Sequence, residues 1–323
     1  MKLNSENIAF IFPGQGSQIV GMGYDLANQF EVCRDIFNQA DEILGFEFSK
    51  ILWEGPSEAL NDTVNTQPAL FVHSYAALRL FENEFPDIKP TYIAGHSLGE
   101  ISALVAAGAI TFENGLKLVR KRGELMKDAG EKSPGGMAAV LGMDVNILED
   151  ICFQASDETG RVQIANDNCP GQIVISGDQS ALERAIELAK TKGARKIRPL
   201  AVSIAAHSTL MNIAQLDFKN AIESIDKFKD VDVPVISNVT AMPMTHSGDL
   251  KLDLVAQLTS RVRWTESIKY IYSNGVSTFI EIGSGNVLTG LLKRINEDCN
   301  GYAFGTLDTI EAFRREMDVS TEM

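Results

Sequence analysis

Apolar and polar positions along the chain follow two different periods. Unbroken apolar runs, typical of buried strands, occur at residues 8–12 and in the run that ends at Gly95, and mostly apolar segments at 233–239 and 276–282 are also read as strands. Between them, apolar residues recur with helical spacing at 25–44, 68–84, 112–129, 252–258 and in the segment through Leu292. Strands that alternate with helices predict an α/β fold with a mostly parallel sheet covered on both faces.

The order of elements changes after Ser133. Between residues 133 and 199 the pattern predicts strand, helix, strand, strand, helix and strand, which is the order of a ferredoxin-like unit. We therefore expect a small ferredoxin-like subdomain at 133–199, inserted into a large hydrolase-like α/β catalytic domain that comprises 1–132 and 200–305. The inserted unit would form one wall of a cleft. Residues 306–323 show no clear pattern and are interpreted as a C-terminal tail.

The stretch Gly95–Gly99 has the G-x-S-x-G spacing of a nucleophile elbow, with a β-prone run before it and a helix-compatible segment after it. Glycines allow a turn tight enough to expose Ser97 above the sheet. The start of the next helix would direct its positive dipole end, and the N–H of Leu98, at a developing oxyanion. We interpret Ser97 as a catalytic nucleophile. The alternative is a Gly-Ser turn that arises by chance.

Arg122 interrupts an apolar helical stripe. Gly115, Leu118, Val119 and Met126 occupy the other positions of the same helix face. An arginine directed inward needs an anion, because an unpaired buried charge is costly. A buried carboxylate or the carboxylate of a ligand would each serve. The guanidinium geometry suits bidentate capture of a substrate carboxylate.

A serine nucleophile needs a base to accept its proton, and the chain has four histidines. His73 lies in a helical pattern, His96 inside the elbow and His246 in a polar loop. His207 is therefore the best-placed general base by elimination. A histidine among apolar neighbours is otherwise more often a core residue with satisfied hydrogen bonds.

Composition narrows the class of protein. Of 323 residues 45% are hydrophobic and 22% charged, as in soluble globular proteins, and the net charge of −14 argues against nucleic acid and acidic membranes as partners. The four cysteines show no C-x-x-C spacing, so neither a disulfide framework nor a metal site is expected. Neither a leader pattern nor a membrane-length apolar run is evident, and we expect a cytoplasmic protein without a bound cofactor.

Several motifs together resemble one family. They are Phe12–Gln18, Gly95–Glu100, Arg122–Gly123, Gly171–Gly177, Val202–His207 and Glu281–Leu288. In this order, over nearly the whole chain, they resemble malonyl-CoA:acyl-carrier-protein transacylases. The resemblance implies that a serine attacks the thioester of malonyl-CoA. The malonyl-serine then passes its acyl group to the phosphopantetheine thiol of acyl carrier protein.

The resemblance also implies a role for individual residues. Ser97 would be the nucleophile and His207 its base, oriented by the backbone carbonyl of Gln257. The N–H groups of Gln15 and Leu98 would form the oxyanion hole. The malonyl carboxylate would pair with the inward arginine, Arg122, and Gln67 and Ala206 are expected as further substrate-binding positions. The chain would act as a monomer that meets its carrier protein transiently.

Acyl carrier proteins are typically acidic, so an acidic chain needs a local basic surface to bind one. Five basic residues gather near the end of the small subdomain, namely Lys190, Lys192, Arg195, Lys196 and Arg198. We interpret them as a candidate carrier-docking surface, with Lys293 and Arg294 as a second basic pair. A solvated helix end is the alternative.

Two positions depart from the family pattern. Ala206 stands where many relatives carry an aromatic residue or serine, and its small side chain would admit a larger extender such as methylmalonyl. Arg261 stands where relatives often carry proline, and the sequence does not indicate its role.

Two other functions use the same residues. The first is a serine acyl hydrolase or thioesterase acting on carrier-bound acyl groups, which would have no use for a buried Arg122. The second is a non-catalytic carrier-binding module, which would not need Ser97 and His207. The donor could serve fatty-acid synthesis or a polyketide assembly line.

Overall fold

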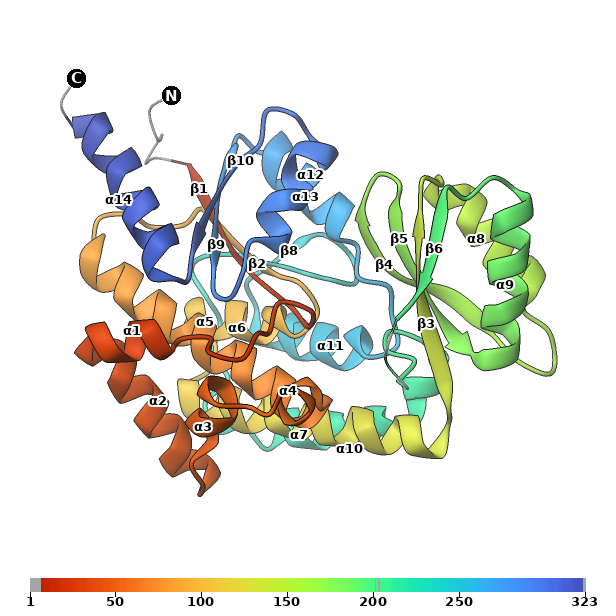
Figure 1. Ribbon diagram of the computed structural model, residues 1–323, viewed down its shortest axis with the longest axis horizontal. Coiled ribbons are helices and arrows are strands. Elements are labelled where there is room, and N and C mark those ends of the chain that lie inside the picture. Colours follow the sequence, from red (N-terminus) through yellow and green to blue (C-terminus); the bar gives the residue numbers. More distant parts are fainter. Residues whose placement is uncertain (1–6, 201, 203, 322–323) are drawn as a thin grey trace.

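Two sheets organise the molecule. The computed structural model describes residues 7–200, 202 and 204–321, with side chains up to residue 317. A six-stranded sheet forms the core of a larger lobe and a four-stranded sheet the core of a smaller lobe beside it (Figure 1). The smaller lobe is built from one continuous stretch in the middle of the chain.

The large sheet explains the unbroken apolar runs of the sequence. Its order is β10 (Asn300–Phe304), β9 (Thr278–Ile282), β1 (Ile8–Phe12), β2 (Tyr92–Gly95), β7 (Val235–Ile236) and β8 (Pro243–Met244). All neighbouring strands are parallel except β7 and β8. In β1, Phe10 and Phe12 face one apolar core while Ala9 and Ile11 face a second core on the other side. Both faces are therefore buried, so no polar alternation is needed.

Helices cover both faces of this sheet. They are α1 (Tyr24–Gln29), α2 (Glu31–Leu44), α3 (Phe48–Trp53), α4 (Ser57–Asn61), α5 (Thr63–Glu84), α6 (Gly99–Ala106), α7 (Phe112–Lys132), α10 (Asn212–Glu223), α11 (Ser247–Gln257), α12 (Trp264–Ser273), α13 (Val287–Ile295) and α14 (Leu307–Thr321), with a 3-10 turn at Thr209–Met211. Helices α12 and α13 belong to one core, whereas α2, α5 and α7 belong to the other. Parallel strands require such crossover helices.

The small lobe has the element order that the sequence predicts. Its sheet order is β4 (Val162–Cys169), β5 (Gln172–Asp178), β3 (Gly135–Leu141) and β6 (Lys196–Pro199), all antiparallel. Helices α8 (Val145–Ala155) and α9 (Gln179–Thr191) pack on the outer face (Figure 1). On the other face, Met137, Ala165 and Val174 form a small apolar cluster together with Ala206. The α/β fold class with a ferredoxin-like small unit is confirmed.

The C-terminal segment differs from the expectation of an unpatterned tail. Residues 307–321 form α14, and Ile310 and Phe313 are fully buried against the large core, with Met317 partly buried beside them. Arg314 also donates to Glu84 of α5. The apolar residues are spaced three and four apart, which is helical spacing, but the polar residues between them hide the pattern.

The expected strand at 233–239 is also much shorter in the structure. Strand β7 ends at Ile236, because the next two residues leave the sheet ladder and bond elsewhere. The hydroxyl of Ser237 donates to Asp253, and the side-chain amide of Asn238 donates to the carbonyl of Gly95 at 2.7 Å. The segment read as a strand in the sequence therefore extends to Val239, three residues beyond the end of β7.

Gly99 offers a test of how tightly the elbow packs on β1. A Cβ at this position would overlap the carbonyl oxygen of Phe12, a backbone atom that cannot move cheaply. We expect Gly99→Ala to lower the free energy of unfolding by about 2 to 4 kcal/mol, measured by urea denaturation. Gly290 in α13 is the matched control, because nothing lies within 4 Å of its added Cβ. Gly290→Ala should stabilise by up to about 1 kcal/mol, and equal effects would contradict the packing argument.

Candidate active site

Ser97 lies on the sharp turn between β2 and α6. Its backbone φ is 53°, in a region that residues with a side chain rarely adopt and that often marks functional sites. A side chain on Gly95 would overlap the backbone of Gly99, so the turn closes this tightly only with glycine there. The N–H of Ser97 donates to Oδ1 of Asn238 at 2.8 Å, which holds the turn from the β7 side. The stretch therefore forms the strand-to-helix turn that its spacing predicts.

His207 contacts Ser97 directly. Its Nε2 lies 2.8 Å from Oγ of Ser97, and its Nδ1 lies 2.9 Å from the carbonyl oxygen of Gln257. Because a carbonyl oxygen only accepts, Nδ1 carries the hydrogen and Nε2 is left to accept the serine proton. Burial, together with the positive charge of Arg122, lowers the pKa of His207 to about 3. The imidazole is therefore neutral at physiological pH.

Arg122 points inward from α7, as its helical stripe predicts, and is 1% exposed. Its guanidinium donates to Oε1 of Gln67 at 2.9 Å, to Oε1 of Gln257 at 2.8 Å and to Oγ of Ser97 at 3.2 Å. These acceptors are all neutral, and the buried Nε has no partner. Burial lowers the pKa of Arg122 to about 10, with an opposing effect from Glu100, so the group stays cationic at neutral pH.

Gln257, the last residue of α11, connects the catalytic groups to one another. Its backbone carbonyl accepts from His207 and its side-chain Oε1 accepts from Arg122. Its Nε2 donates to the carbonyl oxygen of Ser97 at 2.9 Å and also to Oε2 of Glu100. Sequence analysis assigned a function only to the backbone carbonyl.

Two residues that sequence analysis did not single out complete this network. Glu100 is buried in the first turn of α6, and its Oε1 accepts from the backbone N–H of Asn238 at 2.9 Å. Asn238 in turn bonds to the first residue of the elbow, Gly95, and to its central residue, Ser97. A lone acidic residue in the apolar segment that follows the elbow was a signal in the sequence. Asn238 had no comparable signal.

A cavity of about 460 Å³ lies between the two lobes above Ser97. Gln15 and Leu98 line it together with the serine, and Ala206 lines it next to His207; the oxyanion-hole role of Gln15 and Leu98 stays a prediction. Small-lobe residues on its wall are Met137, Ala139, Asn166, Asn168, Gln172 and Val174. The cavity therefore joins polar catalytic groups from the large lobe to a wall of apolar and amide side chains from the small one.

Gln67 lies in a different place from the other expected substrate-binding residues. It is fully buried in α5 behind Arg122, bonded to it and to Sδ of Met126, and it is not among the cavity-lining residues. Its contact with any ligand in the cavity is therefore made through the arginine. Ser203, within the motif Val202–His207, lies outside the described residues.

The five basic residues at the end of the small lobe are exposed but lie on different faces. Arg198 pairs with Ala139 across the sheet, and Ala139 lines the cavity, so Arg198 and the like-facing Lys196 lie on the cavity side. Lys190 and Lys192 lie at the end of α9, on the outer side. Arg195 precedes the strand.

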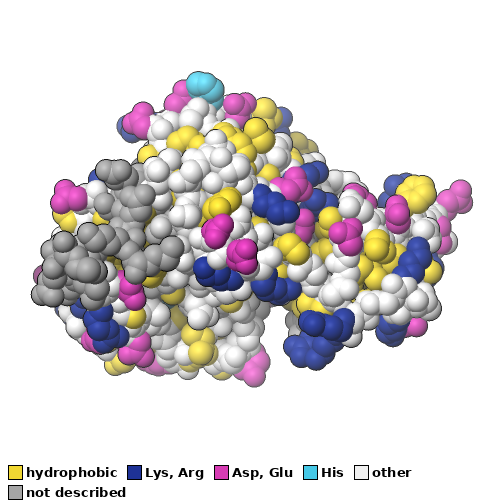
Figure 2. Space-filling model, turned by 90° about the horizontal axis from the view of Figure 1, so that it is seen from above, with side chains coloured by type: hydrophobic (Ala, Val, Ile, Leu, Met, Phe, Trp, Pro, Cys, Tyr) yellow, Lys and Arg dark blue, Asp and Glu magenta, His cyan; other side chains and the backbone are white. Residues whose placement is uncertain are grey.

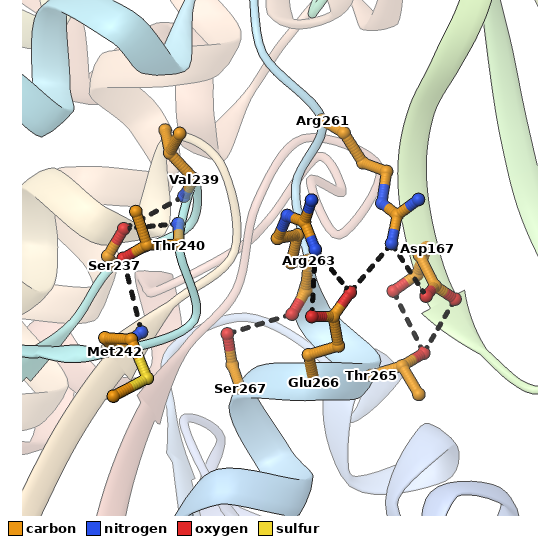
Figure 3. A network of polar contacts seen from close by, with 10 residues as sticks. All are labelled: Asp167, Ser237, Val239, Thr240, Met242, Arg261, Arg263, Thr265, Glu266 and Ser267. Atoms are coloured by element: carbon orange, nitrogen blue, oxygen red, sulfur yellow. Dashed lines mark hydrogen bonds and ion pairs between the residues drawn. The ribbon is translucent and has the colours of Figure 1, made fainter.

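Arg261 joins the two lobes outside the catalytic cavity, as Figure 3 shows. Its Nη2 lies 2.7 Å from Oε1 of Glu266 in α12 and 3.8 Å from Oδ2 of Asp167 in β4. Arg263 contacts the same glutamate, and Thr265 donates to Asp167. Arg261 therefore has a structural contact that the sequence did not indicate.

Two further classes of site are missing from the residues that the structure describes. That part of the chain has no group of three or more His, Cys, Asp or Glu side chains arranged to hold a metal ion. Nor does it have a helix with the length and apolar character needed to span a membrane. All four cysteines are buried as free thiols.

Related sequences match almost the whole chain. A family model for the acyl transferase domain matches residues 9–306. The malonyl CoA-acyl carrier protein transacylase of Bacillus subtilis is 48% identical over 304 residues, which cover 94% of this chain and 95% of that protein. The protein of the same name from Staphylococcus aureus is 41% identical over 305 residues, covering 94% of this chain and 97% of the relative.

Solved structures that resemble this chain carry the same kind of name as these relatives. The malonyl CoA-acyl carrier protein transacylase of Coxiella burnetii has a TM-score of 0.92 at 38% identity and covers 96% of this chain and 98% of its own. A type II PKS acyl-carrier protein in complex with its malonyl-transacylase matches with a TM-score of 0.92, 38% identity and coverage of 96% and 100%. The chain belongs to the acyl transferase domain family and, within it, to the malonyl CoA-acyl carrier protein transacylases.

Proposed function

We propose that this protein transfers the malonyl group of malonyl-CoA, through an ester on Ser97, to the phosphopantetheine thiol of acyl carrier protein. The observation that carries the proposal is the buried guanidinium of Arg122, 3.2 Å from Oγ of Ser97 and without a direct carboxylate partner among the described residues. A buried cation of this kind is costly in free energy unless an anion compensates its charge. The free carboxylate of a malonyl group is such an anion, and the names of the relatives support this choice.

The first half of the reaction acylates the serine. His207 Nε2 takes the proton of Ser97 Oγ, and the oxygen attacks the thioester carbonyl carbon of malonyl-CoA. The N–H groups of Gln15 and Leu98 would donate to the oxyanion that forms. The carbon–sulfur bond then breaks, and His207 returns the proton to the departing CoA sulfur. The products are malonyl-serine and free CoA.

The second half reverses these steps with a different thiol. The phosphopantetheine sulfur gives its proton to His207 and attacks the ester carbonyl, and Ser97 leaves with that proton. During both halves, Arg122 would hold the malonyl carboxylate and keep the reacting carbonyl beside the serine. Ala206, small and next to His207 on the cavity wall, leaves room for a branch on the malonyl group.

No specific observation favours the hydrolase alternative. The relatives are named transacylases, and a hydrolase of neutral acyl chains would not need the buried Arg122. Fatty-acid and polyketide pathways both require the same transfer to a carrier. A cytoplasmic location and a monomeric state stay predictions from the sequence.

Carrier docking at the cleft side of the small lobe completes the proposal. On the face seen in Figure 2, Lys and Arg side chains are interspersed with Asp and Glu side chains, and the net charge of the chain is −14, so carrier docking needs a local basic pair. Lys196 and Arg198 face the cavity side of β6, and no hydrogen bond or ion pair with another described residue occupies their side chains. Arg294 lies nearby on α13 and is partly occupied by Gln172. We therefore narrow the five-residue surface to Lys196 and Arg198, with Arg195 at its edge.

Arg122→Gln tests the substrate. We expect kcat/KM for malonyl-CoA to fall about 30- to 1000-fold, the effect of losing about 2 to 4 kcal/mol from a buried charge pair, with little loss for acetyl-CoA. For each of the two donors, intact-protein mass spectrometry measures formation of the Ser97 adduct, and a steady-state assay measures transfer to carrier protein. Ser97→Ala should form no adduct. Arg120→Gln on the same helix, bonded to Asn65 and Glu124, is the matched control. An equal loss for both donors would rule out carboxylate recognition.

The pKa of His207 predicts an unusual pH profile. Since this pKa lies far below its ordinary 6.5, acylation of Ser97 should show no inflection near 6.5 as the pH is lowered from about 8 to about 5. The unfolded chain binds this proton below 6.5 but the native protein does not, so stability falls as pH drops from 6.5 toward 3. NMR titration of the ring protons measures the midpoint directly. A midpoint near 6.5 would refute the neutral-histidine assignment.

Charge reversal tests the docking surface. Replacing Lys196 and Arg198 by glutamate should raise KM for the acidic carrier at low salt by about tenfold or more, with kcat for small thiol acceptors unchanged. The matched control replaces Lys190 and Lys192 by glutamate, which changes the net charge equally on the outer side. Similar effects of the two pairs would show that only net charge matters.

A further inference from the structure

Two buried carboxyl groups lie beneath the elbow and take no direct part in the reaction. Glu100 comes from α6 and Asp253 from α11, and they are 1% and 7% exposed. Their side chains hydrogen-bond to each other, and burial raises the pKa of both. Two carboxylates cannot bond without a hydrogen between them, so the pair holds one proton.

The hydrogen bonds around Asp253 leave one place for that proton. The hydroxyl oxygen of Ser237 accepts from the backbone N–H of Val239 at 3.1 Å and of Thr240 at 2.8 Å (Figure 3). With both lone pairs used, the Ser237 hydrogen is directed to Oδ1 of Asp253. The backbone N–H groups of Val239 and Asn238 also act on the Asp253 carboxyl, yet its buried Oδ2 has no hydrogen-bond partner among the N–H and O–H groups of the described residues. A hydrogen on Oδ2 would satisfy this atom by donating to Glu100.

Glu100, in contrast, accepts at both oxygens. Arg122 has only donors, so it fixes Gln257 with Oε1 toward the guanidinium and Nε2 toward Oε2 of Glu100. Oε1 of Glu100 accepts from the N–H of Asn238 at 2.9 Å. The charge of Glu100 also acts on Arg122. Two donors and a nearby cation favour the ionised form at this position.

We propose that Asp253 carries the shared proton and Glu100 the negative charge, and that Glu100 thereby positions Arg122 and Ser97 for malonyl transfer. Gln257 connects the carboxylate to the guanidinium, and Asn238 connects it to the Ser97 N–H and the Gly95 carbonyl. Glu100 and Asp253 are positioning residues, because neither lines the cavity. The proposal rests on the malonyl transfer proposed above.

The single negative charge of the Glu100–Asp253 pair balances the positive charge of Arg122. Arg122 stays buried without a contacting carboxylate because the single charge of Glu100 offsets it from behind Gln257. The face of the guanidinium toward Ser97 is thus left for the substrate carboxylate. The charged and titratable groups around the pair are Arg122 from α7 and, beyond Gln257, His207, while Ser237 and Asn238 contribute neutral donors. A second negative charge on Asp253 at high pH would repel Glu100 and disturb Gln257.

Amide substitutions distinguish the two carboxyl groups. Asp253→Asn keeps the shape and supplies a donor where Oδ2 carries its proton, so kcat/KM for malonyl-CoA should stay within about threefold of wild type. Glu100→Gln places an amide NH₂ against the donor of Gln257 or of Asn238, and kcat should fall at least about tenfold. The reverse order, with Glu100→Gln active and Asp253→Asn impaired, would overturn the assignment.

A stability measurement tests the proton without relying on transfer. A raised carboxyl pKa contributes stability below the ordinary value of 3.8 and loses it as pH rises through the folded value. The unfolding free energy of wild type should therefore decline relative to Asp253→Asn as pH increases. A constant difference would overturn the proposal, whereas a chain that transfers some other acyl group would leave this result intact.

Asp253→Ala provides a second test in case Glu100→Gln does not fold. Alanine removes the donor to Glu100 and leaves it unsupported, so kcat should fall at least about tenfold while Asp253→Asn retains activity. Rescue by asparagine but not by alanine would support a hydrogen-bond donor at this position. Equal activity of the two variants would contradict it.

Discussion

The chemistry of this protein depends on keeping one positive charge, that of Arg122, out of water. A buried guanidinium must have its donors and its charge satisfied, and here neutral amides and a serine hydroxyl take the donors. The balancing charge, on Glu100, is set one residue further away, behind Gln257. The cation is thus stable in the protein and still open to an anionic ligand on its Ser97 side. Burial, together with the same cation, lowers the pKa of His207 and keeps that base neutral.

The small lobe forms one wall of the cavity above Ser97. Its β4 strand contacts the large lobe at three successive residues: Asn166 forms an isolated bridge with Val262, Asp167 bonds to Thr265, and Asn168 bonds to His96 within the elbow. These contacts are polar, while Met137 and Val174 on the same sheet present apolar surface to the cavity. Asn166 and Asn168 also line the cavity, so one strand both attaches the small lobe and contributes to the cavity wall. The apolar side chains of this wall reduce the room for water beside an ester that must survive until a thiol arrives.

Sequence patterns predicted the fold where a local rule governs the structure. Unbroken apolar runs marked strands buried on both faces, and the period of 3.6 identified the inward direction of Arg122. The patterns were less informative where side chains change the course of the backbone. Strand β7 stops early because Ser237 and Asn238 bond to other elements. Helix α14 packs through four apolar residues, Leu307, Ile310, Phe313 and Met317, among many charged ones.

For the site itself, the sequence alone determined the residues that a motif or a periodicity marks: the elbow with Ser97, the inward Arg122, and His207 by elimination. Such signals are local, because backbone turns and helix faces depend on neighbouring residues. Only the tertiary structure decided that the Gln257 side chain, Glu100 and Asn238 bond to these catalytic residues. It also decided that Asp253 lies beneath the elbow. Gln257 and Arg122 are 135 positions apart in the chain, and Asn238 and Ser97 are 141 apart. Which polar groups meet over such separations is set by packing of helices and sheet, and no local pattern records it.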